Sequence, residues 1–237
     1  MDMHITAADL TEQVLTRNIA GAKTLTFARD LGLVVIVGDL RIEGGLEAMP
    51  GTSIHCVGAI LTRGNIAVNG DLSATGRIEA DCITTTGAIR GGENLSGAYA
   101  IEANGNISAE NIIVSEVGNI TCNGRLSGKG IIAQQNVHAD LGIFCGGDLR
   151  AVCGDITSFD SIYAAGSVRA GGDISAALGI TAGTRVDAQG TVRANLRILT
   201  GCSCAVVPNL EEMGISGEVE GFHADAPVPE RRQQNAP

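Results

Sequence analysis

Residues 147–176 read GDLRAVCGDITSFDSIYAAGSVRAGGDISA, and an aliphatic residue returns through this stretch at regular intervals. Leu149, Ile156, Ile162 and Val168 are separated by seven, six and six residues. A spacing of six keeps no single stripe on an α-helix, which has about 3.6 residues per turn. The stretch therefore predicts short strands joined by tight corners in a repeat architecture.

The same spacing extends in both directions along the chain. Its 22 aliphatic anchors are Ile66, Leu72, Ile78, Ile83, Ile89, Leu95, Ile101, Ile107, Ile113, Ile120, Leu126, Ile132, Val137, Ile143, Leu149, Ile156, Ile162, Val168, Ile174, Ile180, Val186 and Val192. Weaker continuations are Val34, Leu40, Leu46, Ile54 and Ile60 before them and Ile198 after them. Two intervals between anchors are five residues long and two are seven, so the average interval stays at six. This compensation indicates one-residue adjustments at the corners of a periodic structure.

Small residues hold fixed places relative to each anchor. Alanine often stands two residues after the anchor, as Ala151 and Ala176 do, and glycine often stands four after it, as Gly166 does. Positions i and i+2 of a strand share a face, so each unit points an aliphatic and a small side chain inward. We expect glycine and Asn or Asp at the corners because these residues tolerate positive φ.

Three such units make a coil of about 18 residues, and stacked coils pair their strands in parallel. Every third anchor then forms one internal column, made of Ile66, Ile83, Ile101, Ile120, Val137, Ile156, Ile174 and Val192. The sequence predicts an all-β, single-domain, triangular parallel β-helix of roughly ten coils.

The repeat also has a phase that distinguishes two families of triangular solenoid. In the left-handed hexapeptide acyltransferases glycine typically follows the anchor at once, whereas no anchor here is followed by glycine. The phase of residues 64–68, 147–151 and 172–176, with Gly-Asn or Gly-Asp before the anchor, resembles that of the bactofilins, which are polymer-forming bacterial cytoskeletal proteins. The resemblance covers about residues 34–198. It implies a right-handed β-helix and end-to-end polymerisation without nucleotide through exposed terminal coils.

The chain departs from that family in a longer solenoid and in its N-terminal element, residues 1–22. An amphipathic stripe from Ile5 to Ile19, with Thr6 and Asp9 placed as an N-cap pair, predicts a short helix there. Its simplest role is to cover the open hydrophobic end of the first coil, and the alternative is docking to a partner. Two covered ends would argue against an open filament.

The β-helix is then expected over residues 23–206. Residues 207–237 are expected to form a C-terminal cap followed by a disordered tail, because three of the five prolines lie after Ala224.

Composition narrows the classes of partner. The chain has 237 residues, a formal net charge of −10 and 44% apolar residues, yet only four Phe, two Tyr and no Trp. The acidic charge argues against nucleic acid and leaves basic proteins as candidates. No apolar run approaches the ~20 residues of a membrane helix, and the start, residues 1–4, lacks the basic flank of a signal peptide. We expect a cytoplasmic protein without an integral membrane segment.

The seven cysteines are expected to be free thiols that fill core positions. An odd number without a secretion signal favours a reducing compartment, and no CxxC pair occurs. Cys202 and Cys204 could share one side of a strand, but the four histidines are scattered, so no metal site is predicted. No cofactor is predicted either.

No catalytic constellation stands out in the sequence. His138 is one residue past its anchor position and therefore faces outward, where a hexapeptide acyltransferase could carry a catalytic histidine. No second histidine, carboxylate or nucleophile could be placed beside it, so it is interpreted as solvated surface.

Three aromatic residues form a candidate partner-binding patch. Phe144 and Tyr163 occupy the same outward position in successive coils, and Phe159 lies on the adjoining face, across the corner from Tyr163. Asp148, Asp155 and Asp160 are expected to ring them. The alternatives are a cross-coil stacking pair that supports the solenoid, or a surface covered by the tail.

Three functions follow from these observations. The first is a non-enzymatic, bactofilin-like scaffold that self-associates through coil ends or flat faces. The second is a discrete acidic binding module, similar to an immunity protein or antitoxin, that occludes a basic protein partner. The third is an acyltransferase, which the repeat phase and the lack of a catalytic pair disfavour.

Overall fold

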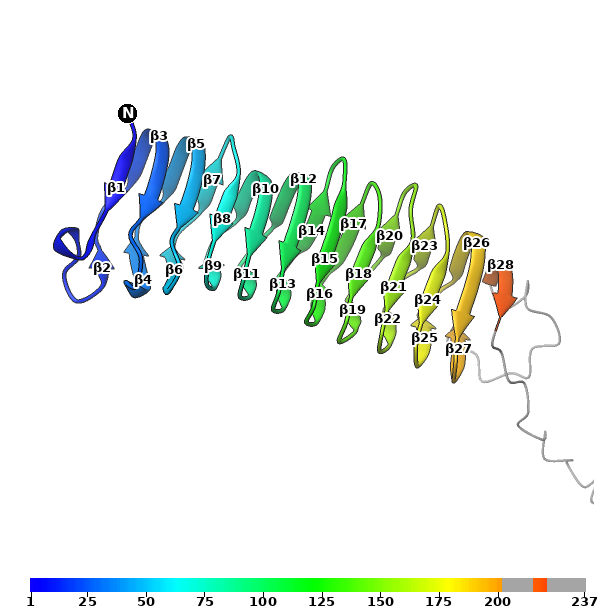
Figure 1. Ribbon diagram of the computed structural model, residues 1–237. Coiled ribbons are helices and arrows are strands. Elements are labelled where there is room, and N and C mark those ends of the chain that lie inside the picture. The colour runs from blue at the N-terminus through cyan, green and yellow to red at the C-terminus, as the bar shows by residue number, and fades with distance from the viewer. Residues whose placement is uncertain (202–214, 221–237) are drawn as a thin grey trace, which may run out of the picture.

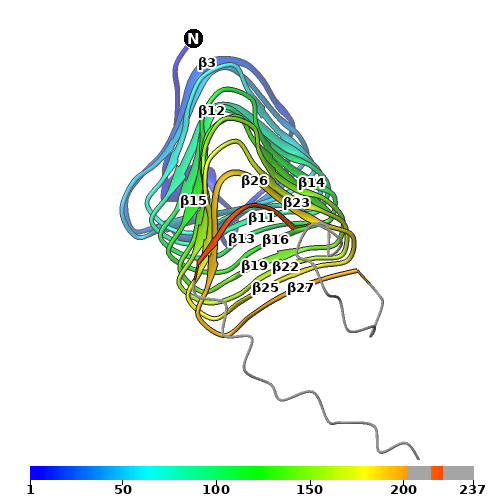
Figure 2. The same ribbon diagram turned by 90° about the vertical axis from the view of Figure 1, so that its right-hand side faces the viewer.

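The computed structural model describes residues 1–201 and 215–220, and these residues form a parallel β-solenoid of about 11 turns with about 18 residues per turn. All pairings between its named strands are parallel. Figure 1 shows the coils stacked along one axis, and Figure 2 shows their triangular cross-section. The all-β parallel fold predicted from the six-residue repeat is confirmed, whereas its handedness stays a prediction.

Face 1 of the triangle is an 11-stranded sheet. Its strands are β2 (Val14–Leu15), β4 (Gly32–Val37), β6 (Thr52–Val57), β9 (Leu72–Ala74), β11 (Ile89–Gly91), β13 (Ile107–Ala109), β16 (Leu126–Gly128), β19 (Ile143–Cys145), β22 (Ile162–Ala164), β25 (Gly179–Ala182) and β27 (Arg197–Thr200). It forms the base of the triangle in Figure 2.

Faces 2 and 3 belong to a single 17-stranded sheet, because five long strands run through the corner between them. These are β3 (Ile19–Phe27), β5 (Leu40–Ala48), β10 (Ile78–Thr85), β12 (Leu95–Ala103) and β26 (Val186–Ala194).

The shorter strands of this sheet lie on one face each. Face 2 contains β7 (Ile60–Thr62), β14 (Ile112–Ser115), β17 (Gly130–Ala133), β20 (Leu149–Ala151) and β23 (Val168–Ala170). Face 3 contains β1 (Met3–Ile5), β8 (Ile66–Val68), β15 (Asn119–Cys122), β18 (Val137–Ala139), β21 (Ile156–Ser158) and β24 (Ile174–Ala176). The last strand, β28 (Ile215–Glu220), pairs with both halves of β26.

The predicted internal column is confirmed by the register of face 3. Ile66, Ile83 and Ile101 are paired in successive coils, and the same register continues to Val192. These side chains are fully buried, and the small residue two positions later also points inward. The core is thus a stack of aliphatic and small side chains, which explains how the chain folds with so few aromatic residues.

One predicted anchor is wrong. Ile131 is fully buried and pairs with Ile113 and Leu149, whereas Ile132 points outward with 37% of its surface exposed. Two adjacent isoleucines fit the spacing almost equally well. The alternation of inward and outward side chains along the strand decides between them, because Ala133 takes the inward position two residues after Ile131.

The predicted reason for the corner glycines holds for only some of them, because Gly38, Gly58 and Gly142 have positive φ whereas glycines such as Gly124 and Gly166 do not. A Cβ at Gly124 would lie 2.7 Å from the backbone nitrogen of Asn106 in the preceding coil. The backbone N–H of Arg125, the next residue, donates to Asn106 Oδ1 at 2.8 Å. Glycine is needed because the Asn or Asp side chain of one coil reaches the backbone of the next.

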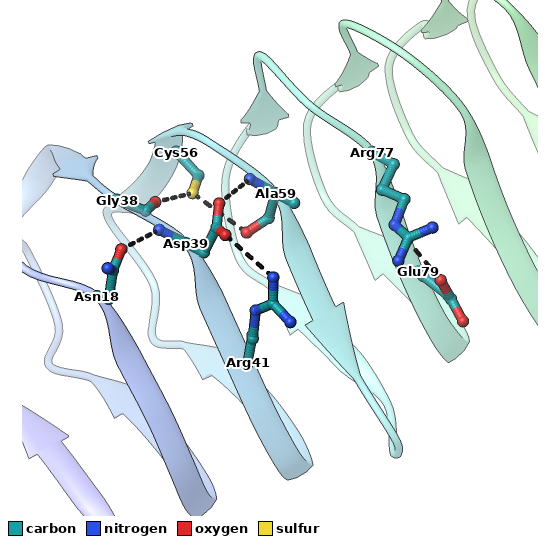
Figure 3. A network of polar contacts seen from close by, with 8 residues as sticks. All are labelled: Asn18, Gly38, Asp39, Arg41, Cys56, Ala59, Arg77 and Glu79. Carbon is teal, nitrogen blue, oxygen red and sulfur yellow. Dashed lines mark hydrogen bonds and ion pairs between the residues drawn. The ribbon is translucent and has the colours of Figure 1, made fainter.

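A second ladder of the same kind runs along the corner before face 3. The backbone N–H groups of Asn136, Asp155, Asp173 and Thr191 donate in turn to Asn119, Asn136, Asp155 and Asp173. Figure 3 shows an N-terminal example, in which Asp39 accepts from the Ala59 N–H at 3.0 Å while its own N–H donates to Asn18 Oδ1 at 2.8 Å. The Ala59 N–H lowers the pKa of the Asp39 carboxyl group.

The predicted N-terminal helix is absent. Residues 1–22 instead contribute β1, a three-residue 3₁₀ turn at Ala7–Asp9, β2 and the start of β3. Thr6 and Asp9 do form an N-terminal capping pair, since the Thr6 N–H and hydroxyl both donate to Asp9 Oδ2 at 2.8 Å. The pair serves a single turn, because Ile5 and Leu15 take inward strand positions and continue the coil.

Most of the predicted C-terminal cap and tail, residues 207–237, lies outside the described residues, as do Cys202 and Cys204. The exception is β28, which adds a strand to the solenoid. Across residues 1–201 and 215–220, no helix has the length and apolar character that crossing a membrane requires.

Candidate functional site

Face 1 carries one outward-facing column of side chains whose chemistry changes along the solenoid. The register pairs place in this column Val35, His55, Ser73, Arg90, Ser108, Ser127, Phe144, Tyr163, Thr181 and Leu199. From Ser73 to Ser127 the side chains are small or charged. From Phe144 onward three of the four are large and apolar. The predicted alignment of Phe144 with Tyr163 is confirmed by their direct pairing between β19 and β22.

The corner that leads into face 1 changes at the same point. Two residues before the inward anchor, the coils from residue 70 to residue 124 have glycine, namely Gly70, Gly87, Gly105 and Gly124. The next four coils have Leu141, Asp160, Leu178 and Leu196 at that place. The three leucines are exposed, Leu178 by 44% and Leu196 by 66%. Apolar corner residues therefore lie beside the apolar part of the outward column.

These residues surround a hollow of about 520 Å³ on the C-terminal half of face 1. Phe144, Tyr163, Leu178 and Leu196 supply its apolar wall, and we call these four residues the apolar strip. The hollow is also lined by Asp160 and Arg197.

Arg125 contacts the strip from the preceding coil. Its guanidinium carbon lies 4.7 Å from the centroid of the Phe144 ring, within cation–π range. Arg125, Leu178, Leu196 and Arg197 were not predicted from the sequence. The signal that could have identified the leucines is the replacement of glycine two residues before the anchor.

The three predicted acidic residues do not form a ring around the aromatics. Asp160 lines the hollow, but Asp148 and Asp155 belong to corner ladders. Asp148 Oδ1 accepts the backbone N–H of Ser167 at 2.7 Å, and Asp155 Oδ1 accepts that of Asp173 at 2.7 Å. Their carboxylates hold successive coils together. The charge around the hollow is therefore mixed, because Asp160 and Arg197 line it and Arg125 contacts Phe144 at its edge.

Phe159 joins a different group of side chains. Its ring packs edge-on against His138 with 5.2 Å between centroids, and 70% of its surface is exposed. His138 faces outward as predicted, but it is not simply solvated. Its Nδ1 lies 2.7 Å from the Thr157 hydroxyl and its Nε2 lies 2.9 Å from Asp140 Oδ1.

In a catalytic triad a hydroxyl is the nucleophile, an imidazole in contact with it is the general base, and a carboxylate orients the imidazole. The same three groups are in contact here. Acyl transfer also needs donors aimed at an oxyanion and a cleft for the acyl group beside the nucleophile. Thr157 lies on the flat outer surface of β21, in register with His138 on β18. The geometry shows directly that the hydrogen bond between His138 and Thr157 links neighbouring coils of face 3.

The described cysteines are mostly core residues, as predicted. Cys56, Cys122 and Cys145 take the inward position two residues after their anchors and are buried, and desolvation raises the pKa of Cys56 and Cys122 to about 11. Cys153 is exposed and Cys82 is half-buried, so the core-filling interpretation is wrong for Cys153 and only partly right for Cys82. Within residues 1–201 and 215–220 no group of three or more His, Cys, Asp or Glu side chains could hold a metal ion.

Comparison with known proteins assigns no family to this arrangement. No family model, no curated protein and no solved structure matches the chain.

Proposed function

We propose that this protein is a non-enzymatic scaffold whose rigid β-solenoid associates with further copies of itself through the flat faces of the coils. The observation that carries the proposal is the apolar strip on the C-terminal half of face 1. Exposed apolar side chains of this kind mark interaction surfaces, particularly when polar residues border them. The bactofilin-like repeat phase supports the same class of function.

The N-terminal end of face 1 favours association through faces rather than through coil ends. The edge strand β2 is two residues long, and the N–H and carbonyl of its Val14 are already bonded to Thr11 at 2.9 and 3.1 Å. The turn between them has Glu12 and Gln13 at φ 52° and 66°. A short edge strand whose free groups are occupied by the chain's own turn is poorly suited to adding another strand.

The proposal is tested by size-exclusion chromatography with light scattering over a range of protein concentrations. We expect the wild type to increase in mass with concentration. The double variant Phe144→Ser, Tyr163→Ser should shift this increase to at least tenfold higher concentration while the circular dichroism spectrum is unchanged. Leu33→Ser, which removes an exposed apolar residue near the other end of face 1, is the matched control. A wild type that stays monomeric at every concentration would contradict the proposal.

A second candidate function is the occlusion of a basic protein by a discrete acidic module, and the net charge of −10 favours it. The mixed charge at the hollow gives it less support than a uniformly acidic rim would. A monodisperse wild type that binds a basic protein, with binding weakened by both the Phe144→Ser, Tyr163→Ser change and by salt, would favour this function over self-association.

A further inference from the structure

Face 2 carries an outward-facing column whose charge changes sign along the solenoid. The register pairs place in it Arg41, Leu61, Glu79, Ser96, Val114, Ile132, Arg150, Arg169 and Asp187. Its middle stretch begins with a carboxylate, passes through two aliphatic side chains and ends with two guanidinium groups. When two copies of this column run in opposite directions, the carboxylate of each faces a guanidinium group of the other and the aliphatic side chains face each other.

The acidic side of this stretch surrounds a hollow of about 450 Å³, which Glu79, Ser96, Glu116 and Val114 help to line. Glu79 forms an ion pair with Arg77 at 3.8 Å, which Figure 3 shows on the outer surface. Both side chains of this pair are more than half exposed, so the pair is weak and Glu79 can exchange partners at little cost.

The apolar centre consists of Val114 and Ile132, which are paired between β14 and β17. Ile132 is exposed, as is Ile112 at the start of β14. The extra isoleucine beside the inward Ile131 is therefore not required by the solenoid interior. It places an apolar group on the surface where the column changes sign.

The basic side consists of Arg150 and Arg169, which lie directly opposite each other on β20 and β23 and are both exposed. Like charges in such a cross-strand pair are unfavourable. The hollow that they line, of about 220 Å³, also contains Arg185 and Asp187, which form an ion pair with each other. An anionic partner group would relieve the repulsion between Arg150 and Arg169.

We propose that face 2 is the contact surface for a second copy of this chain, packed in the opposite direction about a two-fold axis between Val114 and Ile132. This rotation places Val114 of one copy on Ile132 of the other, Ser96 opposite Arg150, and Glu79 opposite Arg169. Each contact occurs twice, as a two-fold interface requires. The inference rests on the proposed function, because it names a second surface through which copies associate.

The size of the contact sets its strength. The five steps from Glu79 to Arg169 span about 24 Å at about 4.8 Å per coil, which places the contact at the small end of specific interfaces. We therefore expect concentration-dependent and salt-sensitive pairing. Together with the apolar strip on face 1, two separate two-fold surfaces on one solenoid would extend a row of copies beyond a closed dimer.

The test uses charge reversal and native mass spectrometry of the full chain. Glu79→Arg alone places a new guanidinium group against Arg169, and Arg169→Glu alone places two carboxylates together, so each variant should dimerise at least tenfold more weakly than the wild type. Mixing the two variants should restore pairing as the mixed dimer, because both contacts then join opposite charges. The double variant Glu79→Arg, Arg169→Glu should regain the wild-type affinity.

Matched controls make the same charge changes on the other faces, with Arg90→Glu on face 1 and Glu102→Arg on face 3, and should leave dimerisation unchanged. If the wild type associates but neither single variant weakens it, the face 2 contact is wrong and the proposed scaffold stands. If the wild type is monomeric at every concentration, both fail. If Arg169→Glu abolishes binding of inorganic phosphate without changing the mass, the arginines form an anion site, and the contact is again overturned.

Discussion

The two halves of face 1 have the same interior and different exteriors. In the coils from residue 70 to residue 127, the corner glycines approach the coil before closely, Gly87 against Asp71 and Gly124 against Asn106, and the outward column is small or charged. In the C-terminal half, leucines replace the corner glycines and aromatic residues enter the outward column. The inward residues are aliphatic or small throughout. The solenoid thus lacks the ladder corner in the coils where exposed apolar side chains gather on face 1, and the variants below test that difference.

The largest effect is expected at a glycine of the ladder corner. In Gly124→Ala the new Cβ would lie 2.7 Å from the backbone of the preceding coil, which cannot move without breaking the coil register. We expect a loss of about 1–3 kcal/mol of unfolding free energy, measured by urea denaturation. Gly146→Ala, in the C-terminal half, is the control: its Cβ would meet Lys129 Cα at 3.5 Å, an ordinary contact, and it should change stability by less than about 0.5 kcal/mol. Equal losses in both variants would refute the close-approach explanation.

A smaller effect is expected when the ladder side chain itself is removed. Asn106→Ala leaves the backbone N–H of Arg125 without its acceptor and should cost about 1 kcal/mol. Asp160→Ala, at the corresponding corner of the C-terminal half, removes only a local bond from the Ser161 hydroxyl, at 3.1 Å. Its unfolding midpoint in urea should stay within error of the wild type. A loss as large as that of Asn106→Ala would show that the two corners are equivalent after all.

The smallest difference is expected between the interiors of the two halves. Cys56 and Cys145 take the same inward position on face 1, and burial raises the pKa of both thiols, that of Cys56 to about 11. Since the thiolate is the reactive form, both should react slowly with iodoacetamide at pH 8, and faster only as the pH rises toward 11. Cys153 is exposed and should react first. Rapid labelling of Cys145 but not Cys56, by peptide mass spectrometry, would mean that the halves differ inside as well.

The fold could be predicted because the same six-residue unit, with its aliphatic anchor, recurs through about eleven coils, so one irregular unit does not obscure the spacing. The same averaging hides single positions. Two adjacent isoleucines at 131 and 132 satisfy the spacing equally, and only pairing with Ile113 and Leu149 decides between them. In residues 5–19 the apolar residues fit a helical stripe, but the first coil offers strand pairing with β3 and β4 that an isolated helix would lose.

The candidate site was partly accessible from the sequence. The alignment of Phe144 with Tyr163 follows from coil length alone. The same register places Thr157 beside His138, one residue after the paired anchors Val137 and Ile156. The contact itself was missed because the rotamers that bring the hydroxyl to the imidazole do not follow from spacing. The role of Asp148 and Asp155 was missed because a corner carboxylate looks solvent-facing until the backbone of the next coil is in place.

The central claim, that the C-terminal half of face 1 is a contact surface between copies, is tested most directly with the two tyrosines of the chain. Tyr163 belongs to the apolar strip and is 46% exposed, whereas Tyr99 lies at the corner between faces 2 and 3 and is 57% exposed. Nitration of both would be followed by peptide mass spectrometry during dilution of the wild type. We predict that Tyr163 is protected at high concentration and becomes reactive on dilution, while Tyr99 reacts at a constant rate. Equal, concentration-independent reactivity of the two residues in a sample that light scattering shows to be assembled would contradict the account.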